Sequence, residues 1–403
     1  MNFLFTCSGT AGHINPALAI ASEIRRRDPE SKLLFIGAGR EIENRLVPQA
    51  GYDLVNIRMS GLQRAITPKN LVRNAAALKN LMLGSREAGK IIKNFCPDAV
   101  IGTGGYICYP VLKKASSYHI LAFIHESNAE PGLTTKLLST IVRNVFTAFP
   151  DLEHMYRAPD RVIFTGTPVM SGFREAGRHG AGQPQSTQTE QVLGQVTEQI
   201  PGQAPGQPQP MQQPGRKPLV VSFWGSLGAE LMNEIMVDFM KLNIRDGSFS
   251  HIHAAGKKGG AARIMERLGQ TGITGELPPG LEIREYIDDM PIVMAGADLV
   301  LCRAGGSTLA ELTAMRKPSV LIPSPYVTNN QQEKNAAHLL KAGAALVLSE
   351  KECTGESLYN AVVSLLRDGE KLRTMSESLE AISEDNAEIK IVDAVLSNIP
   401  QTV

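Results

Sequence analysis

The chain has 403 residues, a length that favours two domains over one hydrophobic core. Its 41 basic residues balance 40 acidic ones, so nothing indicates a protein that binds nucleic acid over its whole surface. The five cysteines form no CxxC pair, which indicates reduced thiols in a cytosolic setting. The N-terminus lacks the pattern of a signal peptide, and no segment reaches the roughly 18 apolar residues of a membrane span. We therefore expect neither export nor a transmembrane segment.

In the first half, short apolar runs alternate with segments of helical periodicity, a rhythm typical of a parallel α/β sheet. Strands are expected at 2–6, 32–37, 53–57, 98–102, 120–124, 144–147 and 162–165. A helix is expected to follow the first strand, with Asn15 as its N-cap and Pro16 at its first position.

One long helical segment, 68–95, mixes apolar and basic residues. Leu78, Met82 and Ile92 lie in it beside Lys79 and other lysines and arginines, and Glu87 is its one acidic residue. Such a face could lie on an anionic membrane surface. The alternative is an ordinary domain helix with a buried apolar side and solvated charges.

The composition changes to Gln, Pro and Gly between the two halves, which predicts a flexible linker. The second half then repeats the α/β rhythm, with strands expected at 219–223, 251–255, 281–286, 297–302, 319–323 and 344–348. The tail contains no Gly or Pro from Glu370 to Ile399, which predicts a long helical end that packs back on the first domain. We expect a first domain at 1–171, a linker at 172–217, a second domain at 218–385 and a returning helix at 386–403.

Four expected strands run into glycine turns, at CSGTAGH, TGGY, WGSLGA and RAGGST. A glycine turn before a helix offers backbone N–H groups to a phosphate, although doubly wound sheets also need tight turns for structural reasons. None of the turns matches GxxxxGK[ST] or a strict GxGxxG, which disfavours a nucleotide kinase or a simple dinucleotide enzyme.

No metal and no cofactor are expected. The chain lacks a DxD pair, and the adjacent Asp288 and Asp289 would point apart on a strand. His251 and His253 share a strand face, but a third ligand is missing nearby, which favours packed or surface histidines.

Six segments together resemble the MurG family of peptidoglycan glycosyltransferases: GTAGHINPALAIA, GTGGY, HESNAEPGLTTKLLS, GSLGAELMN, EYIDDM and RAGGSTLAELTAMRKPSVLIPSPYVTNNQQEKNA. The resemblance covers nearly the whole chain outside the linker. It implies the glycosyltransferase B fold, in which two Rossmann-like, doubly wound parallel-sheet domains face a cleft. The implied reaction is inverting transfer of N-acetylglucosamine from UDP-N-acetylglucosamine to the MurNAc 4-hydroxyl of lipid I, undecaprenyl-pyrophosphoryl-MurNAc-pentapeptide, which forms lipid II for the cell wall.

The resemblance also implies a place and partners for the chain. The enzyme would be peripheral on the cytoplasmic side of the cell membrane, in contact with an anionic membrane surface and with no nucleic acid. Its product would serve peptidoglycan synthesis, and through it cell shape and division.

In the first domain, the resemblance implies that Thr10, Ala11 and Gly12 line the donor side of the first loop, with His13 as the general base. Histidine suits this role because an imidazole ordinarily titrates near pH 6.5. A structural role as a cap on a buried turn is the alternative for His13. Asn128 would bind the donor sugar, whereas from the residue alone it looks like a turn residue.

In the second domain, the resemblance implies a complete donor site. Ser226 would hold phosphate, and the backbone of Ile287 would face uracil. Gly306, Ser307 and Thr308 would hold the diphosphate with helix N–H groups. Glu311 would bind the ribose, and Gln332 with Gln331 would bind the hydroxyls of the donor sugar. A structural alternative for Thr308 and Glu311 is a capping box, because they have its spacing.

The chain departs from the family pattern at several positions. In the first loop, glycines of the family are replaced by Cys7, Ser8 and Ala11. In the third loop, the family's glycine and glutamine are replaced by Trp224 and Leu227. After GTGGY, the family's small pair before proline is replaced by Cys108 and Tyr109, and Met170 stands where an arginine is expected. A lost arginine removes a bidentate phosphate contact, and Tyr109 could reshape the acceptor groove. The altered first-domain loops would fit a transferase with another lipid or polysaccharide acceptor, and the glycine replacements a sugar-nucleotide-binding protein without turnover. A UDP-N-acetylglucosamine epimerase of the same architecture is a separate alternative.

Overall fold

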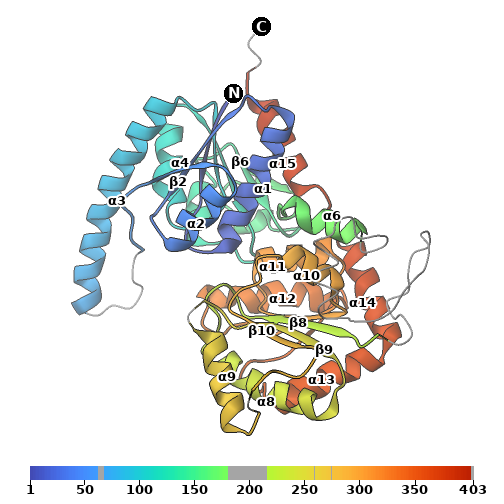
Figure 1. Cartoon of the computed structure of the whole chain (residues 1–403). Coiled ribbons are helices and arrows are strands. Elements are labelled where there is room, and N and C mark those ends of the chain that lie inside the picture. The colour runs from blue at the N-terminus through green and yellow to red at the C-terminus, as the bar shows by residue number, and fades with distance from the viewer. Residues whose placement is uncertain (62–67, 180–215, 258, 274, 401–403) are drawn as a thin grey trace. The chain divides into compact units, whose positions relative to one another are not determined.

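The computed structural model describes residues 1–61, 68–179, 216–257, 259–273 and 275–400. The chain divides into unit 1, Met1–Met170 with Glu384–Val403, and unit 2, Ser171–Ser383 (Figure 1). Most of the linker expected at 172–217 lies outside the described residues. Its first part does not: residues up to 179 belong to helix α6, Ser171–His179, in unit 2.

Unit 1 contains a parallel sheet with the strand order β3-β2-β1-β4-β5-β6-β7. The strands are β1 Asn2–Thr6, β2 Lys32–Gly37, β3 Asp53–Asn56, β4 Ala99–Gly102, β5 Leu121–Glu126, β6 Asn144–Thr147 and β7 Val162–Phe164. Central strands are apolar and buried on both faces, as parallel sheets covered by helices require. The order runs outward in both directions from the β1/β4 pair, which makes this pair the topological switch point.

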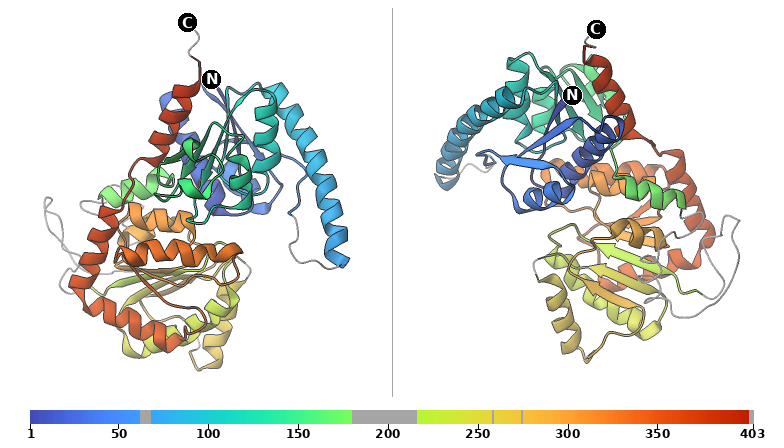
Figure 2. Two further views of the ribbon diagram at one scale, coloured as in Figure 1. Left: turned by 180° about the vertical axis from the view of Figure 1, so that it is seen from behind. Right: turned by 45° about the horizontal axis from the view of Figure 1, so that its top comes forward.

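Helices cover both faces of this sheet (Figures 1 and 2). They are α1 Ala11–Arg27, α2 Glu41–Gln49, α3 Pro68–Phe95, α4 Cys108–Ser117, α5 Leu133–Leu138 and α15 Ala387–Asn398, with short 3-10 turns at Glu153–Met155 and Pro159–Arg161. One core cluster lies between the sheet and α1, and a second lies between the sheet and the α3/α4 side.

The tail forms two helices where the sequence predicted one long one. Helix α14, Gly369–Ala381, belongs to unit 2, and α15 belongs to unit 1. The chain turns at Asn386, whose φ of 69° lies in the left-handed region that asparagine tolerates better than most residues. Ile391, Val392 and Val395 of α15 are buried against α1, and Arg27 of α1 pairs with Asp393.

Unit 2 contains a second parallel sheet with the strand order β10-β9-β8-β11-β12-β13. The strands are β8 Leu219–Phe223, β9 Ser250–Ala254, β10 Leu281–Arg284, β11 Leu299–Cys302, β12 Ser319–Leu321 and β13 Ala345–Val347. The helices are α6, α8 Glu230–Asp246, α9 Gly260–Gln270, α10 Met290–Gly296, α11 Gly306–Ala314, α12 Gln331–Lys341, α13 Gly355–Arg367 and α14, with a 3-10 turn at Thr328–Asn330. Its switch point is the β8/β11 pair. The prediction of two Rossmann-like, doubly wound parallel sheets is confirmed.

His251 and His253 lie in the core of unit 2, which excludes the surface alternative. Both side chains are fully buried, and both bond the hydroxyl of Ser222 on the neighbouring strand, at 2.8 and 2.7 Å. Burial lowers the pKa of both rings, to about 3 for His253. The two imidazoles are therefore neutral packing groups near pH 7.

Candidate active site

Each sheet brings two of the predicted glycine turns together at its switch point. In unit 1, β1 pairs with β4, so the turns after Thr6 and after Gly102 are neighbours. In unit 2, β8 pairs with β11, so the turns after Phe223 and after Cys302 are neighbours. Ligands of doubly wound sheets bind in the crevice that such a switch point opens.

The first helix begins earlier than the sequence predicted. Thr10 is the N-cap of α1, and Pro16 lies inside the helix, so the assignment of Asn15 as N-cap is wrong. The hydroxyl of Thr103, which follows β4, donates to the carbonyl of His13 at 2.6 Å and ties the start of this helix to the neighbouring strand. His13 is the third residue of the helix and lies in its first turn.

The imidazole of His13 has a defined orientation. Its Nδ1 lies 2.8 Å from the carbonyl oxygen of Ser8. A carbonyl only accepts, so this bond assigns the ring proton to Nδ1 and leaves the lone pair on Nε2. A Cβ on Gly104 would lie 2.3 Å from Cδ2 of the ring, which means that the glycine turn after β4 makes room for the imidazole.

The structure accommodates the replaced glycines of the first loop. Cys7, Ser8 and Ala11 have no positive φ, whereas the retained Gly9 has φ 98°. Cys7 is buried in the core against α1, and burial raises the pKa of its thiol well above the usual value. The loop therefore keeps glycine at the position that needs it.

The other residues of unit 1 that depart from the family pattern, two in α4 and one after β7, each have a defined place in the structure. Cys108 is buried in the core on the α3/α4 side, and the hydroxyl of Tyr109 accepts from Lys113 on the next turn of α4, at 3.2 Å. Met170 is partly buried and packs against the α1-side core cluster.

The turn after β5 is organised by a buried carboxylate, Glu126. One of its oxygens accepts from the backbone and side-chain amides of Asn128, at 3.2 and 2.8 Å. The other accepts from Gly132 and Thr135. Nε2 of the neighbouring His125 donates to the carbonyl of Gly166 at 3.0 Å, and its Nδ1 lies 3.3 Å from the hydroxyl of Ser127. Burial lowers the pKa of His125 to about 4.

In unit 2, helix α11 begins with the predicted glycines. Gly305 is the N-cap, so Gly306, Ser307 and Thr308 supply the first-turn N–H groups that an anion binds. The capping-box alternative is wrong, because Thr308 lies three residues inside the helix and cannot be an N-cap. Glu311 follows one turn later and is buried, as is Ser307.

The turn after β8 is held by close backbone packing. Gly225 and Gly228 both have positive φ, and a Cβ on Gly228 would lie 2.2 Å from the carbonyl oxygen of Ala255. Ser226 is half-buried within this turn, and its carbonyl accepts from Lys257 at 3.4 Å. Ile287 follows β10, which lies on the other side of β9 from β8, and it is buried.

Helix α12 brings Gln331 and Gln332 to the same edge of the sheet. Oε1 of Gln332 accepts from the backbone of Ser324 at 2.8 Å, which fixes the side-chain amide. Asn335, one turn on, is fully buried and donates to the carbonyl of Ala304 at 3.1 Å. This links α12 to the glycine turn before α11.

Three buried polar side chains that hold the loops described here are not among the residues predicted from the sequence: Glu43, Glu126 and Asn335. Glu126 and Asn335 lie inside the motifs that carry the family resemblance, and Asn335 shares a helical face with Gln331 and Gln332. Glu43 carried no such signal, because its oxygen accepts from the backbone of Gly9, in a loop 34 residues earlier.

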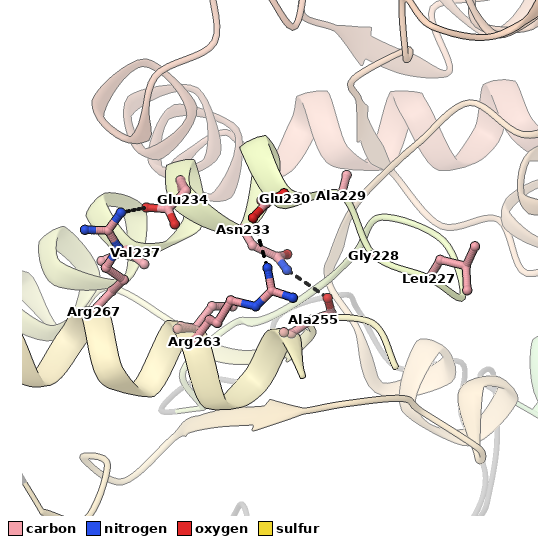
Figure 3. Close-up of a pocket in the computed structure, with 12 residues that line it drawn as sticks. Leu227, Gly228, Ala229, Glu230, Asn233, Glu234, Val237, Ala255, Arg263 and Arg267 are labelled. Carbon is pink, nitrogen blue, oxygen red and sulfur yellow. Dashed lines mark hydrogen bonds and ion pairs between the residues drawn. The ribbon is translucent and has the colours of Figure 1, made fainter. Parts of the chain in front are cut away.

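A pocket of about 300 Å³ lies between α8 and α9 (Figure 3). It borders the turn after β8 through Leu227, Gly228 and Ala229, but none of the predicted site residues lines it. Arg263 and Arg267 on its wall pair with Glu230 and Glu234, at 2.9 and 3.2 Å. Because these arginines are neutralised, the pocket does not have the charge of a diphosphate site.

Within the described ranges, no group of three or more His, Cys, Asp and Glu side chains is placed to hold a metal ion. None of the helices described combines the length and apolarity needed to cross a bilayer.

Two family models match the chain, the glycosyltransferase family 28 N-terminal domain over residues 3–147 and the glycosyltransferase family 28 C-terminal domain over residues 219–390. A relative from Acetivibrio thermocellus is 40% identical over 98% of this chain and 97% of its own, and one from Desulforamulus reducens is 35% identical over 100% of both. Both are named UDP-N-acetylglucosamine–N-acetylmuramyl-(pentapeptide) pyrophosphoryl-undecaprenol N-acetylglucosamine transferase.

Solved structures share the fold. MurG of Acinetobacter baumannii superposes with a TM-score of 0.68 at 22% identity, covering 98% of this chain and 99% of that one. The UDP-GlcNAc 2-epimerase of Neisseria meningitidis has a TM-score of 0.63 at 14% identity, covering 99% of this chain and 100% of that one. At these identities the likeness concerns architecture alone, and it does not distinguish one activity from the other.

Proposed function

The chain belongs to glycosyltransferase family 28, in its MurG group, and from this premise we propose that it transfers N-acetylglucosamine from UDP-N-acetylglucosamine to the MurNAc 4-hydroxyl of lipid I, forming lipid II. The observation that carries the proposal is the fixed His13 imidazole at the β1/β4 switch point, with its lone pair on Nε2. An acceptor hydroxyl needs such a base to become a nucleophile.

In the proposed reaction the 4-hydroxyl of the acceptor attacks the anomeric carbon of the donor sugar. Its proton passes to Nε2 of His13, a new C1–O bond forms, and the bond between C1 and the diphosphate oxygen breaks on the opposite face. The configuration at C1 is therefore inverted. Nδ1–H of His13 keeps its bond to Ser8 throughout, which stabilises the imidazolium that forms.

The leaving UDP is assigned to unit 2. The first-turn N–H groups of Gly306, Ser307 and Thr308 would stabilise the charge that develops on the diphosphate. Ser226 would add a phosphate contact, the backbone of Ile287 would face uracil, and Glu311 would accept from the ribose hydroxyls.

The donor sugar is assigned to amide side chains. Gln331 and Gln332 of α12 would contact its hydroxyls. For Asn128, and for Thr10, Ala11 and Gly12 of the first loop, we propose the donor-binding roles that the family resemblance implies. The bonds of Glu126 to Asn128 and of Ser324 to Gln332 support these roles, because a fixed amide presents its polar atoms without an ordering cost.

The lipid acceptor implies a membrane-associated enzyme, and we assign the contact to α3. Leu78 and Met82, one turn apart, are 54% and 55% exposed, and Lys79 and Arg86 lie beside them. Exposed apolar side chains flanked by cations bind an anionic lipid surface. The protein would thus sit peripherally on the cytoplasmic leaflet.

The test is UDP release by the purified protein from UDP-N-acetylglucosamine, with and without a lipid I analogue, followed by mass analysis of the product. Acceptor-dependent release with one added N-acetylhexosamine is the expected result. Donor binding without acceptor-dependent release would contradict the proposal, and N-acetylmannosamine products would indicate an epimerase.

The role of His13 is tested by His13→Ala, with His154→Ala as the matched control, because His154 is exposed in the 3-10 turn Glu153–Met155. His13→Ala should lower kcat by about 100-fold or more while donor affinity stays unchanged. Full turnover in His13→Ala would eliminate the base assignment.

A further inference from the structure

The peptide group between Ser8 and Gly9 is hydrogen-bonded at both ends to side chains. Its N–H, on Gly9, donates to Oε1 of Glu43 at 2.9 Å. Its carbonyl, on Ser8, accepts from Nδ1 of His13 at 2.8 Å. A buried carboxylate and the imidazole are therefore joined through a single planar peptide unit.

Glu43 lies in the first turn of α2 and is only 1% exposed. Its second oxygen accepts from the backbone of Ala38 at 2.7 Å and of Arg40 at 3.4 Å. Helix capping explains the bond to Arg40, because a glutamate at the third helical position caps in this way. It does not explain the bond to Gly9, which crosses 34 residues to the loop after β1.

We propose that Glu43 is a positioning residue for His13 and acts through the Ser8–Gly9 peptide. This inference rests on the proposed role of His13 as base. The carboxylate is a strong acceptor, so it fixes the plane of the peptide and aims the Ser8 carbonyl at the ring. Hydrogen bonds in series polarise one another, which strengthens that carbonyl as an acceptor for Nδ1–H.

The consequence is a single imidazole tautomer. With Nδ1 committed to Ser8, the lone pair is on Nε2, the atom that takes the proton of the acceptor hydroxyl. The carboxylate of a Ser-His-Asp triad has the same effect by direct contact with its histidine. In this chain one backbone peptide stands between the two groups.

Glu43→Gln separates this role from capping. Glutamine also serves in capping boxes, so the bond to Arg40 can persist. Its amide nitrogen cannot accept, however, so either Gly9 or Ala38 loses its acceptor, and the charge is removed. Glu41→Gln is the matched control, since Glu41 is exposed in the same helical turn.

The first measurement is the tautomer of His13 in protein carrying ¹⁵N-labelled histidine rings. Long-range ¹H–¹⁵N correlations report which nitrogen holds the proton, and His13→Ala identifies the signal among the eight histidines. Wild type and Glu41→Gln should show only the Nδ1–H form of the neutral ring, and Glu43→Gln a mixture. Predominant Nε2–H in wild type, or an unchanged tautomer in Glu43→Gln, would overturn the proposal. This measurement needs no turnover.

The second measurement is steady-state kinetics with donor and lipid I analogue. Glu43→Gln should lower kcat about 10- to 100-fold, the usual effect of losing a group that orients a reacting residue, with KM for the donor nearly unchanged. Wild-type kcat in a folded Glu43→Gln protein would overturn the proposal. Failure of the proposed function appears differently, as a wild-type protein without UDP release, and the ring signals then still decide whether Glu43 sets the tautomer.

Discussion

Asn335 of α12 is bonded to Ala304, 31 residues earlier, at the entrance to the glycine turn before α11. The asparagine is fully buried, so its amide must find its partners inside the protein. The contact couples the helix that carries Gln331 and Gln332 to the turn that presents the helix N–H groups.

We expect Asn335→Leu to weaken UDP binding about 10-fold or more, because the Ala304 carbonyl loses its donor and the turn can shift. The unsatisfied carbonyl should also cost about 1–3 kcal/mol of stability. Isothermal titration with UDP measures the first effect. Fluorescence of Trp224, the chain's one tryptophan and buried in unit 2, follows the second. Unchanged UDP affinity would show that the contact is only structural.

Gly104→Ala should displace the imidazole of His13, since the new Cβ would lie 2.3 Å from Cδ2. Turnover should fall about 10-fold or more, and UDP affinity should be retained because the change is in unit 1. Gly51→Ala is the control. Gly51 also has a positive φ, of 77°, but a Cβ there meets nothing within 4 Å, so the control carries the backbone strain without the contact. Equal kcat in the two variants would refute the steric argument.

The stability of unit 2 should fall as the solution is acidified. The folded pKa values of His251 and His253 lie below the ordinary value near 6.5, because burial disfavours the charged rings. Below pH 6.5 the unfolded chain takes up protons that the folded chain does not, so stability is lost. Between pH 7 and pH 5 the free energy of unfolding should fall by on the order of 2 kcal/mol for each histidine.

Denaturant titrations followed by Trp224 fluorescence measure this loss, because Trp224 is buried in unit 2. His251→Gln combined with His253→Asn replaces both rings with neutral amides that can reach Ser222. In this variant the free energy of unfolding should depend less steeply on pH between pH 7 and pH 5. An unchanged pH dependence would place the titrating groups elsewhere.

Removing the exposed apolar pair of α3 should weaken membrane binding. Leu78→Gln with Met82→Gln should reduce sedimentation with vesicles that contain anionic lipid, and added salt should reduce binding of the wild-type protein as well. Leu340→Gln is a matched control, because Leu340 is 52% exposed on α12 of unit 2. Equal loss in the double variant and the control would argue against α3 as the contact.

Hydrophobic periodicity was sufficient to predict the architecture. Each expected strand is present in the structure, within two residues at either end. Buried parallel strands are continuous apolar runs bounded by glycine turns, so their signal is local. The turns themselves were found for the same reason, and the edge of the sheet at which they gather follows from the alternation of strand and helix.

Local signals misplaced two helix starts, and one tertiary contact was missed. Pro16 suggested a helix start at that position, but the helix begins at Ala11 with Thr10 as its N-cap. Thr308 and Glu311 had capping-box spacing, but the cap is Gly305. Glu43 has no local mark of function at all, since its partner Gly9 comes from another loop.

The return of α15 to unit 1 determines when that unit can be completed during protein synthesis. Ile391, Val392 and Val395 fill a core that also contains Phe3 and Phe5, at the opposite end of the chain. A ribosome makes the N-terminal residues first, yet their core gains its last apolar layer only when the final helix emerges. Unit 1 therefore lacks this layer while the whole of unit 2 is translated, and a chain that ends before residue 387 lacks the side chains that α15 packs against α1.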